Sequence, residues 1–240
     1  MSLAKKSGLY LPRRQFLSIA GMSTLSLILA GCETNFLDGT VRNLAQPFNE
    51  KMEGLLFNPR KLAREFADTE IEPEALLINT FDVTPQIDPR TFELKIDGQV
   101  KRPLNLNLAQ IQNLPRTTMT IRHICVEGWS AIVQWAGVRL REIANLAQPA
   151  ANVRYVYFKS ADGYYESWDI ASALHPQTLL AYEKNGRTLD VDNGAPLRLA
   201  SPIKLGYKQS KWVTQVSFLV RKPRMSGYWE DQGYEWFAGL

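Results

Sequence analysis

The amino-acid sequence predicts an α+β domain built from mixed β-sheets and short helices. Three observations favour this class: short strand-like segments alternate with short helical ones, turn residues separate them, and the chain contains no internal repeat. The 240 residues are 45% hydrophobic and 22% charged, which is the composition of a globular protein with a sizeable core. These values exclude a disordered, collagen-like or disulfide-stapled chain.

The first expected elements lie before and at the start of the domain. Apolar residues at helical spacing predict a peripheral helix over 43–56, which Asn58-Pro59 ends. With a tether, this helix makes up residues 32–75, and we expect the compact domain over 76–240. Residues 91–98 alternate apolar and polar side chains and end in Asp-Gly, which predicts a strand and a turn.

The rest of the domain is expected to alternate helices and strands. Short helices are predicted over 108–114 and 138–146, each closed by a following proline. β-Branched and aromatic residues predict strands over 117–125, 153–158, 197–200 and 211–220. In the last strand, alternation assigns five side chains to one face: Trp212, Thr214, Val216, Phe218 and Val220. No glycine-rich phosphate loop of the P-loop or Rossmann kind occurs.

Residues 1–31 carry the whole net charge of the chain. They contain four basic residues and no acid, and the formal net charge is +4, so the remaining residues are neutral in sum. A neutral body offers no electrostatic footprint for a polyphosphate. Nucleic acid is therefore not an expected partner.

The same segment has the pattern of an export signal. Basic residues precede the apolar stretch Ile19–Ala30, which is too short for a confident membrane span. Arg13-Arg14 resembles the twin-arginine export signal, and the four residues that end at Cys32 resemble a bacterial lipobox. We expect a lipoprotein of the periplasm or cell envelope, acylated at Cys32 and touching the membrane only through that anchor. A plain signal anchor with an incidental arginine pair and cysteine is the alternative.

The second cysteine, Cys125, is then a lone thiol, which is either buried and inert or a ligand or nucleophile. His123 would share its face on a strand, which a cysteine hydrolase could use, although a hydrogen-bonded core histidine is the commoner role. A zinc enzyme is disfavoured, because the chain has only His123 and His175 and no Cys-x-x-Cys spacing.

Three separated strings are the most distinctive feature of the chain. They are Arg122-His-Ile-Cys-Val-Glu-Gly-Trp-Ser130, Asp192-Asn-Gly-Ala-Pro-Leu-Arg198 and Lys204-Leu-Gly-Tyr-Lys-Gln-Ser-Lys211. In this order they resemble the sulfite-oxidase-fold molybdopterin enzymes, and among these the catalytic subunits of bacterial periplasmic protein-methionine-sulfoxide reductases. The resemblance runs from about Leu76 to the C-terminus. It implies a sulfite-oxidase-type molybdopterin-binding fold and a molybdenum-molybdopterin cofactor, with one pterin and one molybdenum per chain.

The resemblance assigns roles to individual residues. Cys125 matches the thiolate ligand of molybdenum, a soft ligand that suits the metal. Asn193 and Arg198 match a pterin-binding pair, and the arginine can form bidentate bonds to a phosphate. A further segment matches residues that hold the cofactor: Gln209, Ser210 and Lys211.

Other assignments depart from the family pattern. Ser160 stands where the family has a threonine that contacts the pterin, and it keeps the hydroxyl. Asn79, Phe81 and Asp82 fall where the family has Asn-x-x-Tyr-Glu, with a different spacing and different residue types. Glu127 matches a residue close to the metal and is a candidate catalytic residue.

The residues after Cys125 bear on the substrate. In the sulfite and nitrate branch of the family, the ligand cysteine is followed by Ala-Gly-Asn-Arg-Arg, whereas this chain has Val-Glu-Gly-Trp-Ser. A carboxylate and an indole disfavour a small dianion and tolerate a neutral sulfoxide. We therefore expect reductive removal of oxygen from methionine sulfoxide, on proteins or in a related S- or N-oxide. Because no Cys-x-x-Cys-His haem motif is present, the resemblance implies an external donor, a membrane haem b or quinol-linked protein.

Two other classes stay open. One is a sulfite-type dehydrogenase or another small-molecule oxidoreductase of the same fold, which a basic pocket with Arg122, His123 or Lys208 would favour. The other is an exported binding module without catalysis. Asn193-Gly194 can also be a hairpin turn, and Trp129 and Trp135 can be core residues.

Overall fold

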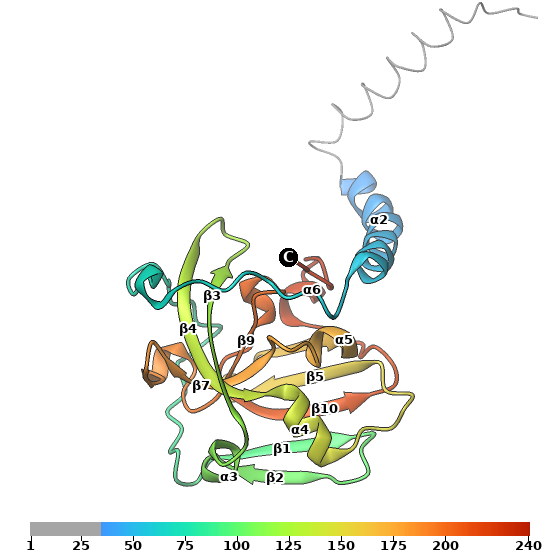
Figure 1. Ribbon diagram of the computed structural model, residues 1–240. Coiled ribbons are helices and arrows are strands. Elements are labelled where there is room, and N and C mark those ends of the chain that lie inside the picture. The colour runs from blue at the N-terminus through green and yellow to red at the C-terminus, as the bar shows by residue number, and fades with distance from the viewer. Residues whose placement is uncertain (1–34) are drawn as a thin grey trace, which may run out of the picture. The chain divides into compact units, whose positions relative to one another are not determined.

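The computed structural model describes residues 35–240. Within them, Glu50–Leu240 form one compact unit, and the residues before Glu50 belong to a separate one (Figure 1). The arginine pair, the apolar stretch and Cys32 lie outside the described residues, so the export signal and the lipid anchor stay predictions.

The first described helix, α2, covers Asn35–Leu56, so the predicted peripheral helix exists but begins before residue 43. Pro47 lies inside it, and the helix stops just before Asn58-Pro59, as expected. In residues 35–240, no helix combines the length and the apolar character that crossing a membrane requires.

In the described part of the chain, ten strands form two five-stranded sheets. The first sheet is mixed, because β1 and β10 run parallel while its other neighbours run antiparallel. Its strand order is β2 (Leu104–Asn107), β1 (Glu93–Gly98), β10 (Val213–Leu219), β5 (Tyr155–Ser160) and β6 (Tyr165–Asp169). The second sheet is antiparallel and runs β3 (Arg116–Ile124), β4 (Ser130–Arg139), β7 (Leu179–Lys184) and β8 (Arg187–Thr188), with β9 (Arg198–Ala200) also pairing with β7.

Short helices connect these strands, which confirms the predicted α+β class. The α-helices are α3 (Leu108–Gln112), α4 (Leu140–Ala147), α5 (Ile170–Ala173) and α6 (Tyr228–Asp231). The 3₁₀ turns are η2 (Asp68–Glu70), η3 (Val191–Asn193) and η4 (Gly206–Lys208).

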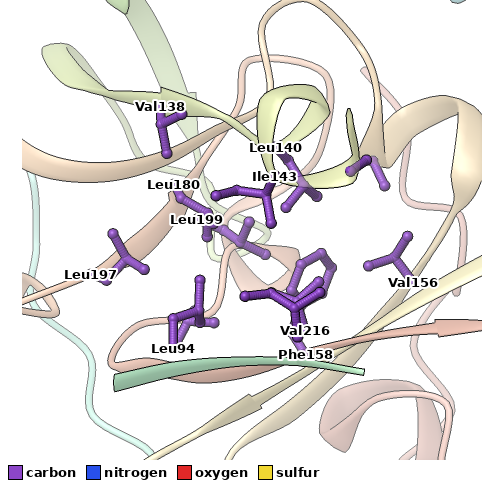
Figure 2. Close-up of a cluster of buried hydrophobic side chains, with 14 of the residues drawn as sticks. Leu94, Val138, Leu140, Ile143, Val156, Phe158, Leu180, Leu197, Leu199 and Val216 are labelled. Atoms are coloured by element: carbon purple, nitrogen blue, oxygen red, sulfur yellow. The ribbon is translucent and has the colours of Figure 1, made fainter. Parts of the chain in front are cut away.

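The main core joins the two sheets (Figure 2). Leu94, Phe158 and Val216 come from the first sheet and meet Val138 and Leu180 of the second, with Leu140 and Ile143 of α4 packed beside them. The other face of the second sheet is also buried, in a smaller cluster around Trp135. Strands covered on both faces do not alternate apolar and polar residues.

This double burial explains two errors in the expected elements. Strand β4 has no clean alternation and was not expected, so the helix predicted to start at Val138 begins only at Leu140. Gly137 lies so close to β7 that a Cβ there would stand 2.1 Å from the Leu180 carbonyl oxygen. Strand pairing on both sides of β4 decides its conformation, and neither β6 nor β7 was expected either.

A bulge in β10 overturns the predicted side-chain face. The register against β5 shifts between Val213 and Gln215, so Val213 joins Val216 and Phe218 in the core in place of Thr214. Trp212 lies before the strand with φ +49°, and its indole donates to the Val191 carbonyl oxygen at 2.8 Å. The single-face prediction for this strand is therefore wrong.

The segment before residue 76 is bonded to the second sheet. Phe66 N donates to Thr120 O at 2.8 Å, and Glu72 and Ile132 are joined by two hydrogen bonds of 2.9 Å. This attachment carries the chain to residues 76–81, which border the site described below. The domain boundary expected at residue 76 stays a prediction.

Candidate functional site

A pocket of about 450 Å³ opens at the end of β3. Its lining comes from loop 76–81, the β3–β4 loop, the β5–β6 turn, the η3–β9 segment, the η4 loop and the C-terminal segment. Segments far apart in sequence therefore meet here, and each brings polar or aromatic side chains. The site depends on both sheets.

Cys125 lies in the hairpin loop between β3 and β4, directly after the last paired residue of β3. Its backbone N–H donates to Trp129 O at 2.9 Å, and Gly128 N donates to Cys125 O at 3.2 Å. Gly128 has φ +91°, a conformation that side chains disfavour, so glycine suits this turn. The thiol is free and half-buried, and burial raises its pKa.

Two glycines allow segments of the pocket to approach each other closely. A Cβ on Gly206 would stand 3.0 Å from His123 Nε2 and 3.5 Å from Cys125 Cα. Gly194 has φ +106°, and a Cβ there would stand 3.0 Å from Lys211 Cβ and 3.1 Å from Arg198 Cβ. Because glycine has no Cβ at either position, the neighbouring segments can approach this closely and form adjacent walls of the pocket. Asn193-Gly194 is thus not a hairpin turn but part of the crossover from β8 to β9.

Glu127 joins three pocket residues through one carboxylate oxygen. Its Oε2 accepts from Trp129 Nε1 at 2.9 Å, from Asn79 Nδ2 at 2.8 Å and from Cys125 Sγ at 3.6 Å. The bonds from Trp129 and Asn79 lower the pKa of Glu127, so the carboxylate is ionised at neutral pH. A negative charge therefore stands beside the thiol.

His123 is buried between two indoles. Its ring stacks on Trp129 with centroids 5.9 Å apart and lies 6.4 Å from Trp135. Burial lowers the pKa of His123 to about 3, so the imidazole is neutral. In the described residues no hydrogen bond joins His123 to Cys125, which gives no support to a cysteine–histidine nucleophile. Trp135 is a core residue, whereas Trp129 lines the pocket.

The pocket also contains two positively charged side chains, Arg198 and Lys211, which we call the cation wall. The buried Arg198 guanidinium donates to Asn193 O at 3.0 Å and Leu199 O at 3.1 Å and lies 4.5 Å from the Trp135 ring centroid. Lys211 Nζ donates to the carbonyl oxygens of Asn79 at 2.5 Å and Asp192 at 2.9 Å.

Within the described residues the cation wall is not paired with a carboxylate, although Asp162 and Asp192 act on Lys211 from a longer distance. Neither cation forms an ion pair within residues 35–240. Burial lowers the pKa of Arg198 to about 9, and burial with the nearby Arg198 charge lowers that of Lys211 to about 8. A buried arginine and a partly buried lysine without an ion pair fit an anionic ligand such as a phosphate. With a thiol in the same pocket, the donor set fits the predicted phosphate-bearing, molybdenum-containing cofactor.

The structure brings together nine of the eleven candidate residues of the pocket. Those in the lining are Asn79, Phe81, Cys125, Glu127, Asn193, Arg198, Gln209, Ser210 and Lys211. Ser160 and Asp82 are not in the lining: Ser160 is buried opposite Val213 in the first sheet, and Asp82 is exposed. The β5–β6 turn instead presents Asp162 and Tyr164, so the roles of Ser160 and Asp82 stay predictions.

Sequence reasoning missed several lining residues, most of them aromatic. They are Asp162, Tyr164, Tyr207, Tyr228, Trp229 and Tyr234. The density of aromatic residues in the last thirteen residues was the available signal, but no strand or helix pattern tied that segment to the site.

Comparison with known proteins assigns the chain to a family. Residues 81–229 match the oxidoreductase molybdopterin binding domain. A protein of Azospira oryzae with the provisional name protein-methionine-sulfoxide reductase subunit YedZ1 is 36% identical over 242 residues, 95% of this chain and 87% of that protein. The protein-methionine-sulfoxide reductase catalytic subunit MsrP of Campylobacter jejuni is 28% identical over 243 residues, 93% of this chain and 77% of that one.

A solved structure supports the fold. The sulfane dehydrogenase SoxCD from Paracoccus pantotrophus superposes with a TM-score of 0.56 at 21% identity, over 59% of this chain and 42% of that chain. The chain thus spans less than half of that structure, and the likeness bears on the fold alone. It agrees with the expected sulfite-oxidase-type fold, and the matched domain confirms the expected cofactor class. The chain belongs to the molybdopterin-binding oxidoreductase family and is an enzyme that uses a molybdenum-molybdopterin cofactor.

Proposed function

We propose that this enzyme reduces sulfoxides, with methionine sulfoxide in oxidised proteins as its substrate. The reaction breaks the S=O bond, takes up two electrons and two protons, and releases a thioether and water. The carrying observation is the ionised Glu127 beside Cys125, bonded to the Trp129 indole. Because like charges repel, this carboxylate disfavours an oxyanion substrate and tolerates a neutral sulfoxide. The names of the two relatives support the same substrate class.

We assign the pocket residues roles around the cofactor. When bound, the cofactor supplies two-electron oxygen-atom transfer. Cys125 would hold the molybdenum through its thiolate, and the cation wall would bind the phosphate of the pterin. Asn193 and Ser210 would contribute hydrogen bonds to the same ligand. The Gln209 amide donates to Ser201 O and Lys204 O, so Gln209 would instead hold the η4 loop beside the cofactor. Glu127 would position Asn79 and Trp129 around the reacting atoms.

The sulfite-type alternative has less support. It calls for a basic pocket around Arg122, His123 or Lys208. Arg122 is exposed beside the Phe66 ring, His123 is neutral, and Lys208 is buried and paired with Glu166. The basic side chains in the pocket lining are Arg198 and Lys211 of the cation wall, and in this proposal they bind the pterin and not the substrate.

Export and electron supply complete the proposal. The arginine pair and the lipobox favour twin-arginine export and acylation of Cys32, which places the enzyme in the periplasm or cell envelope. The electrons would come from a membrane haem b or quinol-linked protein, since the sequence lacks a haem-attachment motif. An oxidised protein or a small sulfoxide would be the other partner.

The test is to measure molybdenum per chain and sulfoxide reduction with the same exported protein. Wild type should carry about one molybdenum per chain and oxidise a reduced viologen dye when a methionine-sulfoxide peptide is added. Cys125→Ser should lose the metal, whereas the matched control Cys32→Ser should keep both metal and activity and lose membrane attachment. Molybdenum with sulfite oxidation but no peptide reduction would support the alternative dehydrogenase. No molybdenum from cells that make the cofactor would instead favour the binding module.

A further inference from the structure

Three aromatic residues of the C-terminal segment line the pocket, and we call Tyr228, Trp229 and Tyr234 the aromatic wall. Trp229 is 38% exposed and Tyr234 39% exposed. Their ring centroids are 5.1 Å apart, and Tyr228 lies 4.5 Å from Phe81 on the neighbouring loop. These rings form a continuous apolar surface that remains open to solvent.

A buried ion cluster includes Glu230 of the segment that carries the aromatic wall. Lys208, Glu166 and Glu230 are almost completely buried, and Glu230 directly follows Trp229. Lys208 Nζ lies 2.5 Å from Glu166 Oε1, also contacts Glu230 Oε1, and donates to Ser167 O at 3.2 Å. Burial raises the pKa of Glu166 well above its usual value, so a proton on this carboxyl leaves the cluster neutral.

Lys208 also belongs to the segment that faces the cofactor site. Its neighbours Tyr207 and Gln209 both line the pocket. The Tyr207 hydroxyl donates to Glu235 O at 2.6 Å, and Leu205 N donates to Ala238 O at 3.2 Å. One segment thus presents residues to the cofactor and holds the C-terminal segment beside them.

We propose that Trp229 and Tyr234 are specificity-determining residues that contact the organic part of the sulfoxide substrate, and that Lys208 and Glu230 position them. This inference rests on the proposed function. The polar lining has roles around the cofactor, so the aromatic wall is the part of the pocket left to bind apolar groups. Aromatic rings attract the sulfur and methylene groups of a methionine side chain. A larger substrate covers more of the aromatic wall, so the wall favours a peptide over a minimal sulfoxide.

The experiment compares two substrates on the molybdenum-loaded enzyme, a peptide that contains methionine sulfoxide and dimethyl sulfoxide. Trp229→Ala and Tyr234→Ala should each lower kcat/KM for the peptide about tenfold, mainly through KM, and change that for dimethyl sulfoxide less than about twofold. Met225→Ala is the matched control, because Met225 is exposed near the same segment but does not line the pocket. It should leave both values and the molybdenum content unchanged.

An equal loss for both substrates, or no loss for the peptide, would overturn the specificity role. A wild-type enzyme that holds molybdenum but reduces neither sulfoxide would instead contradict the proposed function, so the two failures are distinct.

A second pair of variants tests the positioning residues. Glu230→Ala should raise KM for the peptide several-fold with little change in kcat, whereas Glu230→Gln keeps an oxygen acceptor for Lys208 and should restore the wild-type KM. Equal KM values in both folded variants and wild type would remove the positioning role. If Glu230→Ala does not fold, Glu230→Gln still has to match wild type, and the Trp229 and Tyr234 variants decide the specificity role.

Discussion

Two buried cations of this protein, Lys208 and Arg198, have opposite surroundings. Lys208 is fully buried and meets two carboxyl groups, Glu166 and Glu230. Arg198 is almost as buried, yet among residues 35–240 its guanidinium contacts carbonyl oxygens and the face of Trp135 and forms no ion pair. A charge that the protein neutralises itself serves the structure. A charge left without a counter-ion at a pocket marks the place where a ligand supplies one.

The largest effect on stability is expected at Lys208, whose charge is neutralised within the protein. Lys208→Met leaves two carboxyl groups buried without their cation, which should lower the free energy of unfolding by about 3–5 kcal/mol. Chemical denaturation of wild type and variant measures this change. If the free energy of unfolding falls by less than about 1 kcal/mol, the ion cluster does not stabilise the fold, and the contrast between Lys208 and Arg198 is wrong.

The opposite result is expected for the cation wall. In protein prepared without cofactor, Arg198→Met removes an uncompensated charge and should leave the free energy of unfolding within about 1 kcal/mol of wild type, or raise it. The same variant should lower cofactor retention at least about tenfold, which corresponds to about 1.4 kcal/mol of binding free energy. Denaturation of the cofactor-free protein and molybdenum per chain after gel filtration give the two values. A strongly destabilised variant that retains molybdenum would contradict the comparison.

The smallest effect concerns the pH dependence of Lys211. Its pKa is lowered to about 8 in the folded protein, mainly by burial, against an ordinary lysine value near 10.4 in the unfolded chain. Between these two pH values the unfolded chain binds more protons, so Lys211 makes cofactor-free protein more stable as pH rises from about 8 to about 10. Below pH 8 both states are charged, and this contribution is constant.

The Lys211→Met variant isolates that contribution from the other titrating groups. The difference in unfolding free energy, wild type minus variant, should shift in favour of wild type between pH 7.5 and pH 9.5. A difference that is flat with pH would place Lys211 in an environment no different from solvent.

The elements could be predicted from the sequence where local signals were strong. The proline-closed helix near residue 108 and the alternating strand near residue 93 occur with small shifts at their ends. Strand β4 could not be predicted in this way, because it is buried on both faces and pairs with β3 and β7. The bulge at Val213 likewise follows from pairing with β5 and leaves no local pattern.

For the site, three strings in order indicated Cys125, Arg198 and Lys211 as cofactor residues, and all three lie in one pocket. The resemblance that assigned them concerns chemistry-bearing residues, which carry their signal in the sequence itself. Ser160 was assigned by the same resemblance but lies outside the lining, since the β5–β6 turn presents Asp162 and Tyr164 there. A match at a single sequence position therefore does not predict whether the side chain there lies in the pocket.

The sequence by itself determined the fold class, the family and the cofactor class, because strand and helix periods and motif residues are local properties of the chain. Only the tertiary structure decided that Arg198 has no ion-pair partner in the described part of the chain while Lys208 has two, and that the aromatic wall lines the pocket with Cys125. Those features depend on contacts between residues far apart in the chain, such as Lys208 with Glu166 and Lys211 with Asn79. The sequence shows which side chains are charged, whereas the packing of the folded chain decides which of them have an ion-pair partner.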